Sequence, residues 1–231
     1  MFQKKVSEFM ANLLFPKFCF GCKKEGFWIC QECFSKINFS ERFSCPICEK
    51  ILPNGKICEN CRKKTKLNRF FSAAKYEDSL IKEVIHKLKY EFIKELAISL
   101  SYPLSNFLKQ FYFDSDFLIV PVPLHKSRKR WRGFNQAEEI AKKISKEIKI
   151  PIVSENLFRV KKTFPQVEMN DHQKRLENIT GAFNIKNLKV FQDKKIILVD
   201  DVYTSGATME ECAKVLRSAG AKEIWGIVVA K

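Results

Sequence analysis

The sequence lacks any long hydrophobic run: no stretch approaches the roughly 20 apolar residues that a membrane-spanning helix needs. Residues 1–16 contain neither a continuous apolar core nor a small-residue cleavage site, so we expect no secretory signal. Both absences predict a cytoplasmic protein. Apolar residues recur at helical spacing over residues 2–14, which predicts a docking face within the protein; peripheral contact with the inner face of the membrane is the alternative.

Acidic residues are also in short supply, since 26 Asp and Glu stand against 42 Lys and Arg and give a net charge of +16. The excess is densest in residues 1–66, which carry 13 basic and 6 acidic side chains. A basic surface favours a polyanionic partner such as nucleic acid, but it also promotes solubility. Charge by itself therefore does not decide between these roles.

Cysteine, by contrast, is abundant and regularly spaced, because eight of the nine cysteines form four Cys-x2-Cys pairs within 43 residues. In a reducing compartment such pairs indicate metal rather than disulfides, and two pairs complete a closed tetrahedral zinc site. A module of about 60 residues also buries too little surface to fold without such help. We predict two structural Zn2+ ions, with sequential pairing preferred to an interleaved one, on Cys19, Cys22, Cys30, Cys33, Cys45, Cys48, Cys58 and Cys61.

From about residue 67 the pattern changes to alternating helices and strands. Helices are predicted from Asp78 or Ser79, over a stretch to about residue 110 that Pro103 interrupts or starts, from an Asn135–Glu138 capping box to Ile148, and over 206–219. Strands are predicted at 117–125, 156–160, 181–185, 195–199 and 223–229. The ninth cysteine, Cys212, shares an apolar helical stripe and is predicted to be a core residue.

This alternation predicts an α/β fold, with a mostly parallel sheet and helices on both faces, over residues 67–231 after a zinc module at 1–66. In such sheets ligands bind beyond the carboxyl ends of the strands. The loops 121–133 and 200–208 both follow strands. They are the candidate site.

At the second of these loops, four apolar residues run into Asp200 and Asp201 and then into a loop of hydroxyls and glycine. Two carboxylates suit the hydroxyls of a ribose, while the loop and the helix start that follows suit a monophosphate. The loop has no lysine and no GxxxxGK[ST] pattern, which excludes a nucleoside triphosphate P-loop. The predicted phosphoribosyl contacts are Asp200, Asp201, Thr204, Ser205, Gly206, Ala207 and Thr208.

The stretch ILVDDVYTSGAT resembles the 5-phosphoribosyl-1-pyrophosphate (PRPP) binding motif of type I phosphoribosyltransferases. VPVPLHKSRKRWRGFNQAEEIA and RVKKTFPQVEMNDHQKRLENITGAF resemble signature stretches of the ComF family of competence proteins, as do LLFPKFCFGC and IHKLKYEF. The resemblance covers nearly the whole chain. It implies a type I phosphoribosyltransferase-like fold with an N-terminal double zinc-ribbon module.

The resemblance also implies roles for particular segments. Residues 161–177 would form a mobile loop over the substrate, residues 70–113 would contribute a hood, and Mg2+ would arrive with the pyrophosphate. The pyrophosphate loop would comprise Pro121, Val122, Pro123 and Lys126.

A basic run follows that loop, with five cations, no acid and one tryptophan between residues 126 and 132. These cations could hold the pyrophosphate, or they could follow a single-stranded nucleic acid while Trp131 stacks on a base; a merely solvated loop is the third interpretation. The candidates for mobile-loop or nucleic-acid contacts are Arg128, Lys129, Arg130, Trp131, Arg132, Lys161, Lys162 and Arg175.

Two functions follow from the sequence. The first is a competence-type role in the uptake or handling of single-stranded DNA, with DNA-uptake or recombination proteins as partners and a PRPP-like ligand in the site. The alternative is an active PRPP-dependent phosphoribosyltransferase with an unidentified acceptor. The sequence does not decide whether turnover occurs, and no residue is assigned a catalytic role.

Overall fold

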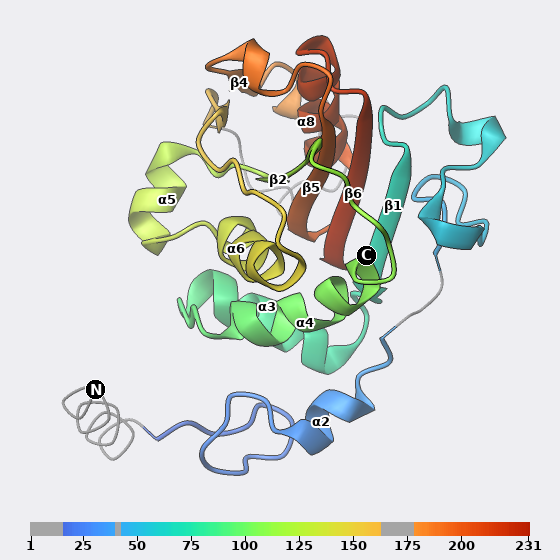
Figure 1. Ribbon diagram of the computed structural model, residues 1–231. Helices are drawn as coiled ribbons and strands as arrows, with labels where there is room; N and C mark the ends of the chain where they lie inside the picture. The colour runs from blue at the N-terminus through green and yellow to red at the C-terminus, as the bar shows by residue number, and fades with distance from the viewer. Residues whose placement is uncertain (1–15, 40–42, 163–177) are drawn as a thin grey trace.

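A four-stranded parallel sheet forms the centre of the computed structural model (Figure 1). The model describes residues 16–39, 43–162 and 178–231. The strands lie in the order β1-β6-β5-β2, with bounds Arg69–Ala74, Glu223–Ala230, Lys195–Val202 and Phe117–Pro121. The predicted parallel sheet is confirmed, although β1 was not predicted.

Helices cover both faces of this sheet. Alternate residues of β5 point to opposite faces, so Ile197 lies in the apolar core beneath α3, α4 and α6, whereas Ile196 lies in the core beneath α8. Figure 1 shows α3, α4 and α6 gathered on one side of the sheet. The four helices are α3 (Ser79–Tyr90), α4 (Leu96–Leu108), α6 (Gln136–Ile148) and α8 (Ala207–Ser218). Cys212 is fully buried in the α8 core, as predicted.

Several boundaries differ from the sequence predictions. The strand expected at 117–125 ends at Pro121, and residues 126–132, expected to be loop, form helix α5 (Lys126–Arg132). His125 caps α5 by accepting from the Ser127 N–H, and Gly133 ends it with φ of 80°. The density of like charges concealed this helix, although its two caps are legible in the sequence.

Two other predicted boundaries also move. α4 begins at Leu96 and passes through Pro103, which is neither its start nor a break. β5 continues to Val202, because Asp200 still lies in register with Val228 of β6. The two acids therefore lie within the end of a strand, just before its last residue, rather than in the loop.

Residues 157–185 add a small antiparallel pair, β3 (Leu157–Arg159) with β4 (Phe183–Ile185), followed by the short helix η4 (Leu188–Val190). Both strands were predicted. The segment 70–113, expected to contribute a hood, begins with an edge strand of the main sheet, and its residues that line the cavity described below are Tyr76, Lys82, Lys89 and Tyr90.

The cysteine-rich segment carries helix α2 (Gln31–Lys36) and two short helices, η1 (Pro53–Gly55) and η2 (Glu59–Cys61). In Figure 1 its first part lies below the helices and its second part lies beside β1. Within the described ranges no helix is both long and apolar enough to cross a membrane. The predicted stripe at 2–14 and Arg175 lie outside the described residues.

Candidate functional site

A cavity of about 370 Å³ opens at the carboxyl ends of β5 and β2. It lies where the parallel-sheet rule places a ligand. Its wall is formed by Tyr76, Lys82, Lys89, Tyr90, Val122, Pro123, Leu124, Arg128, Arg132, Gln136, Arg159, Asp200, Asp201, Val202, Thr204 and Thr208. Residues from both predicted loops are thus brought together around one space.

Among the residues that the structure describes, Asp200 and Asp201 are the only carboxylates on this wall. As consecutive strand residues they point to opposite faces of the sheet. Asp200 accepts a hydrogen bond from the Asp201 N–H at 2.9 Å, and Asp201 pairs with Lys89 Nζ at 2.9 Å. Burial, and then the Asp201 charge, raise the pKa of Asp200 well above its usual value. The pair therefore holds one acid with a salt-bridge partner and one that is costly to ionise.

Lys89 comes from the last turn of α3 and was not predicted as a site residue. Burial lowers its pKa, but the charge of Asp201 outweighs that effect and the net pKa is raised. The ammonium group therefore stays charged at the cavity wall. Its only sequence signal was its place in the family-like stretch IHKLKYEF.

The loop between β5 and α8 brings hydroxyl groups to the cavity. Thr204 and Thr208 line it, whereas Ser205, Gly206 and Ala207 stand behind them. Gly206 has φ of 75°, and a Cβ there would collide with the Tyr203 hydroxyl, so only glycine fits. The start of α8 has one long hydrogen bond, from the Ala207 N–H to Ser205 Oγ at 3.4 Å. Hydroxyls and helix N–H groups together suit an anion.

Three arginines also line the cavity. Arg128 and Arg132 stand one turn apart on α5, and Arg132 Nη1 donates to Gln136 Oε1. Burial lowers the pKa of Arg132, while burial and the charge of Arg128 lower that of Arg159, on β3, to about 10. Arg159 and Gln136 were not predicted. The cavity wall thus combines three guanidinium groups with two carboxylates.

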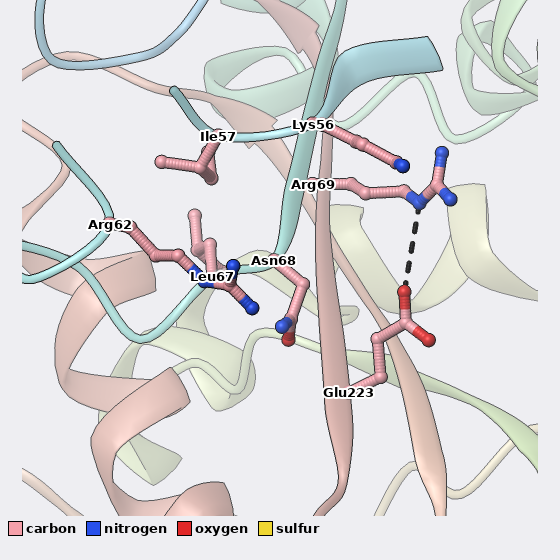
Figure 2. A pocket seen from close by; sticks show the side chains of 7 residues that line it. All are labelled: Lys56, Ile57, Arg62, Leu67, Asn68, Arg69 and Glu223. Carbon is pink, nitrogen blue, oxygen red and sulfur yellow. Dashed lines mark ion pairs between the residues drawn. The ribbon is translucent and has the colours of Figure 1, made fainter. Parts of the chain in front are cut away.

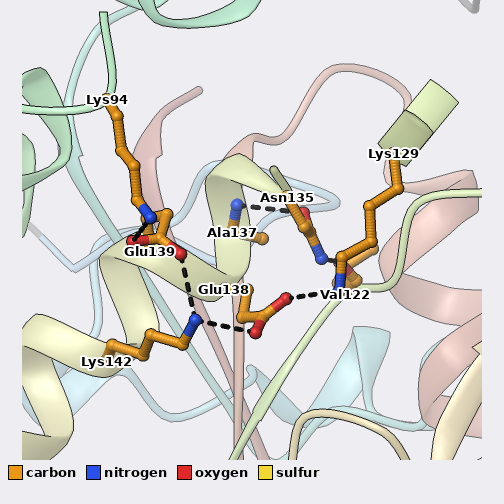
Figure 3. A network of polar contacts seen from close by, with 8 residues as sticks. All are labelled: Lys94, Val122, Lys129, Asn135, Ala137, Glu138, Glu139 and Lys142. Atoms are coloured by element: carbon orange, nitrogen blue, oxygen red, sulfur yellow. Dashed lines mark hydrogen bonds and ion pairs between the residues drawn. The ribbon is translucent and has the colours of Figure 1, made fainter. Parts of the chain in front are cut away.

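A polar network on α6 fixes the loop after β2 (Figure 3). Asn135 Nδ2 donates to the Val122 carbonyl at 3.0 Å, and its side-chain oxygen accepts from the Ala137 N–H at 3.2 Å. The predicted capping box is only half formed, because Glu138 pairs with Lys129 and Lys142 at 3.0 and 2.8 Å instead of returning to the cap. Nearby lysines thus compete successfully for that carboxylate.

The remaining predicted contacts lie away from the cavity wall. Lys126, Lys129, Arg130 and Trp131 sit on other faces of α5. Lys161 Nζ donates to the Thr180 carbonyl at 3.0 Å and so braces the ends of the β3–β4 connection. Pro121 is the last residue of β2, and Lys162 lies next to Lys161.

The eight cysteines form two clusters with the preferred sequential pairing. Within each cluster the four Sγ atoms lie within 4.8 Å of one another. A tetrahedral zinc with bonds of about 2.3 Å would hold its sulfurs about 3.8 Å apart, and the Cys48–Cys58 separation of 3.5 Å is close to this value. A Cβ on Gly21 would lie 2.7 Å from Cys33 Sγ, so the first knuckle needs glycine there. The donor sets fit two structural Zn2+ ions.

A second hollow, of about 200 Å³, lies where the second cluster meets the start of β1 and β6 (Figure 2). Lys56, Arg62, Arg69 and Glu223 are the charged residues that line it, and Arg69 pairs with Glu223 at 3.6 Å. This hollow is at the amino ends of the strands, opposite the cavity. It is therefore a basic surface feature at the end of the sheet where the parallel-sheet rule expects no ligand.

Comparisons with known proteins agree with this architecture. A family model of the phosphoribosyl transferase domain matches residues 90–231, and a model of the double zinc ribbon domain matches residues 10–62. The chain belongs to the phosphoribosyl transferase domain family, and its two cysteine clusters are structural zinc sites.

Individual relatives narrow the class. The chain is 28% identical to Competence protein ComFC of Bacillus subtilis (strain 168), over 83% of this chain and 79% of that protein. It is 29% identical to DNA utilization protein YhgH of Escherichia coli (strain K12), over 92% and 97%. With Competence protein F of Haemophilus influenzae it shares 38% identity, over 47% and 48%. The protein is ComFC-like, as its motifs predicted.

Proposed function

We propose that the cavity binds PRPP with Mg2+ and that the protein acts in the handling of single-stranded DNA. The observation that carries the first part is that one cavity is lined by two carboxylates, two threonines and three arginines. A phosphoribosyl pyrophosphate has groups that match them, a ribose diol, a 5-phosphate and a pyrophosphate. Few other small ligands carry both a diol and a pyrophosphate and fit a cavity of this size.

Each group of lining residues has a role in the proposed PRPP complex. Asp200 and Asp201 accept hydrogen bonds from the ribose hydroxyls, while Thr204, Thr208 and the start of α8 hold the 5-phosphate. Arg128, Arg132 and Arg159 face the pyrophosphate. Mg2+ would neutralise charge on the pyrophosphate, and the two aspartates are the carboxylates available to it.

Transfer to an acceptor is the alternative role of the same site. The pyrophosphate would leave the anomeric carbon through an oxocarbenium-like state, and guanidinium groups fixed opposite the leaving group would stabilise its developing charge. The part of the cavity wall that the structure describes identifies no acceptor. Turnover therefore needs its own assay, by release of pyrophosphate.

DNA handling rests on different support. The relatives include two proteins named for competence and one named for DNA utilization. The net charge of +16 and the cations of α5 that face away from the cavity suit a phosphate backbone. The proposed partners are therefore single-stranded DNA and the proteins of DNA uptake or recombination.

The test of the PRPP site is thermal unfolding of the zinc-loaded protein with and without PRPP and Mg2+. A ligand at 100 times its dissociation constant contributes about 2.7 kcal/mol, which raises the melting temperature by about 5–10 °C in a protein of this size. We expect this increase in the wild type and its loss in the double variant Asp200→Asn/Asp201→Asn. A folded, zinc-loaded wild type that shows no increase would reject the PRPP site.

A further inference from the structure

Two exposed aromatic side chains stand beside the cavity. The rings of Phe92 and Trp131 meet edge to face with centroids 5.0 Å apart, and the residues are 40% and 61% exposed. Phe92 has φ of 60°, a left-handed conformation that is rare for a bulky residue. Such strain persists where the surrounding structure enforces it, and it is concentrated at binding sites. An exposed aromatic pair in which Phe92 is strained is typical of a binding surface.

Both halves of the pair are fixed by one helix. Glu138 and Glu139, in the first turn of α6, pair with Lys129 at 3.0 Å and with Lys94 at 3.1 Å (Figure 3). Lys129 lies on α5 with Trp131, and Lys94 lies in the loop with Phe92. The adjacent acids therefore hold the helix and the loop side by side. The aromatic pair is formed before any ligand arrives.

The geometry of α5 separates its cations into two groups. Successive helical residues are about 100° apart, so residues four apart share a face. Arg128 and Arg132 face the cavity, whereas Lys126 and Arg130 lie about 200° around the helix and are exposed. Trp131 lies between these faces. The basic run thus serves the cavity with one face and presents exposed charge beside an aromatic ring with another.

We infer that Phe92 and Trp131 form a stacking step for a base of single-stranded DNA, outside the cavity, with Lys126 and Arg130 along the phosphate backbone. This inference rests on the proposed DNA handling and specifies its surface. A nucleotide within a DNA strand has no free diol, and its phosphodiester would oppose Asp200 and Asp201. The sugar site therefore suits a small phosphoribosyl ligand, and the strand runs beside it.

The test compares the binding of oligothymidylate and of an abasic oligonucleotide. Each is about 16 nucleotides long, which is the upper end of the length that one single-strand-binding domain covers. Stacking is worth about 5- to 150-fold per base, so the wild type should prefer oligothymidylate by at least that lower factor. Trp131→Ala and Phe92→Ala should remove the preference, and Trp131→Phe should retain most of it. Tyr112→Ala, at a residue 92% exposed elsewhere, is the matched control. Circular dichroism and melting temperature establish that each variant is folded.

The other outcomes overturn distinct claims. If the wild type binds oligothymidylate and Trp131→Ala and Phe92→Ala bind it equally well, the stacking step is wrong and DNA handling stands. If the folded wild type binds neither oligonucleotide, both are wrong, while the PRPP melting test is unaffected. If Trp131→Ala instead reduces binding to anionic lipid vesicles and leaves oligothymidylate binding intact, the face contacts membrane and the inference fails.

Discussion

The two zinc clusters each consist of two Cys-x2-Cys pairs, yet they occupy different positions in the fold. In the first, Cys19, Cys30 and Cys33 form a small core of their own that touches the rest of the protein through residues such as Leu80 of α3. In the second, Cys45, Cys58 and Cys61 belong to the same core as Phe70 and α8. One cluster is a satellite, whereas the other is part of the phosphoribosyl domain's packing.

The second cluster also connects to the site. Glu210, in the first turn of α8, accepts hydrogen bonds from Thr65 Oγ1 at 2.6 Å and from the Lys66 N–H at 2.7 Å. The ring of Tyr203 lies against Phe70, with centroids 4.6 Å apart, and its hydroxyl lies beneath Gly206. The chain just after Cys61 is therefore tied to α8, the helix that begins at the loop after β5.

The strongest test removes each metal in turn. Structural zinc contributes apparent binding free energy of the order of 10 kcal/mol, so Cys58→Ser should lose one zinc, lower the melting temperature steeply and abolish the increase caused by PRPP and Mg2+. Cys30→Ser should also lose one zinc but retain most of that increase. Metal analysis and melting curves measure both. Equal loss of the PRPP response in the two variants would contradict the distinction between the clusters.

The two acids extend the comparison, because Asp201 faces the α3 side of the sheet and Asp200 faces the side of α8 and the second cluster. Removing the charge of Asp201 leaves Lys89 without its ion-pair partner, and the Lys89 side chain is 21% exposed. Breaking a fully buried pair costs about 3–5 kcal/mol; with partial exposure we expect Asp201→Asn to cost about 1–3 kcal/mol. Denaturant unfolding without ligand measures this, and Lys89→Met/Asp201→Asn should recover part of the loss. An unchanged stability would show that the pair contributes nothing.

A smaller change isolates the connection between the second cluster and α8. Glu210→Gln keeps the shape but weakens two hydrogen bonds to a charged acceptor, and we expect it to cost about 1–2 kcal/mol. Zinc content should remain at two ions per chain, and the PRPP-induced increase in melting temperature should shrink. Glu32→Gln, on α2 of the first cluster, is the matched control with no such effect. A zinc loss in Glu210→Gln would mean that the residue supports the cluster itself rather than the connection.

Sequence reasoning recovered the features that local chemistry encodes. The cysteine pairs, the strand–helix alternation and the run from apolar residues into Asp200 and Asp201 each depend on neighbouring residues. Lys89 and Arg159 were missed because their role depends on contacts with residues far along the chain. The site can be located from its motif, but its cationic wall needs the fold.

Segments with competing signals were misjudged for a related reason. α5 was read as a loop because five like charges mask its His125 and Gly133 caps, and β1 was missed because a six-residue strand at a sheet edge has little periodicity of its own. Phe92 belongs to the family-like stretch IHKLKYEF, but its backbone strain is invisible in a sequence. The stacking step therefore emerges only when α5 and the loop after α3 are placed together.

The smallest expected effect concerns Asp200 in the absence of ligand. Its pKa is raised in the folded state, so its contribution to stability is present below the ordinary carboxyl pKa of 3.8 and is lost as pH rises through the higher folded-state pKa. Asp200→Asn removes this cost, and should raise the melting temperature at pH 8 by about 2–4 °C for each 1 kcal/mol recovered, with a smaller gain at pH 5. The sign is opposite to that for Asp201→Asn, and the PRPP response should still fall. The prediction means that the Asp200 charge destabilises the empty site, which only the ligand that it binds explains. A lower melting temperature of Asp200→Asn at pH 8 would contradict this prediction.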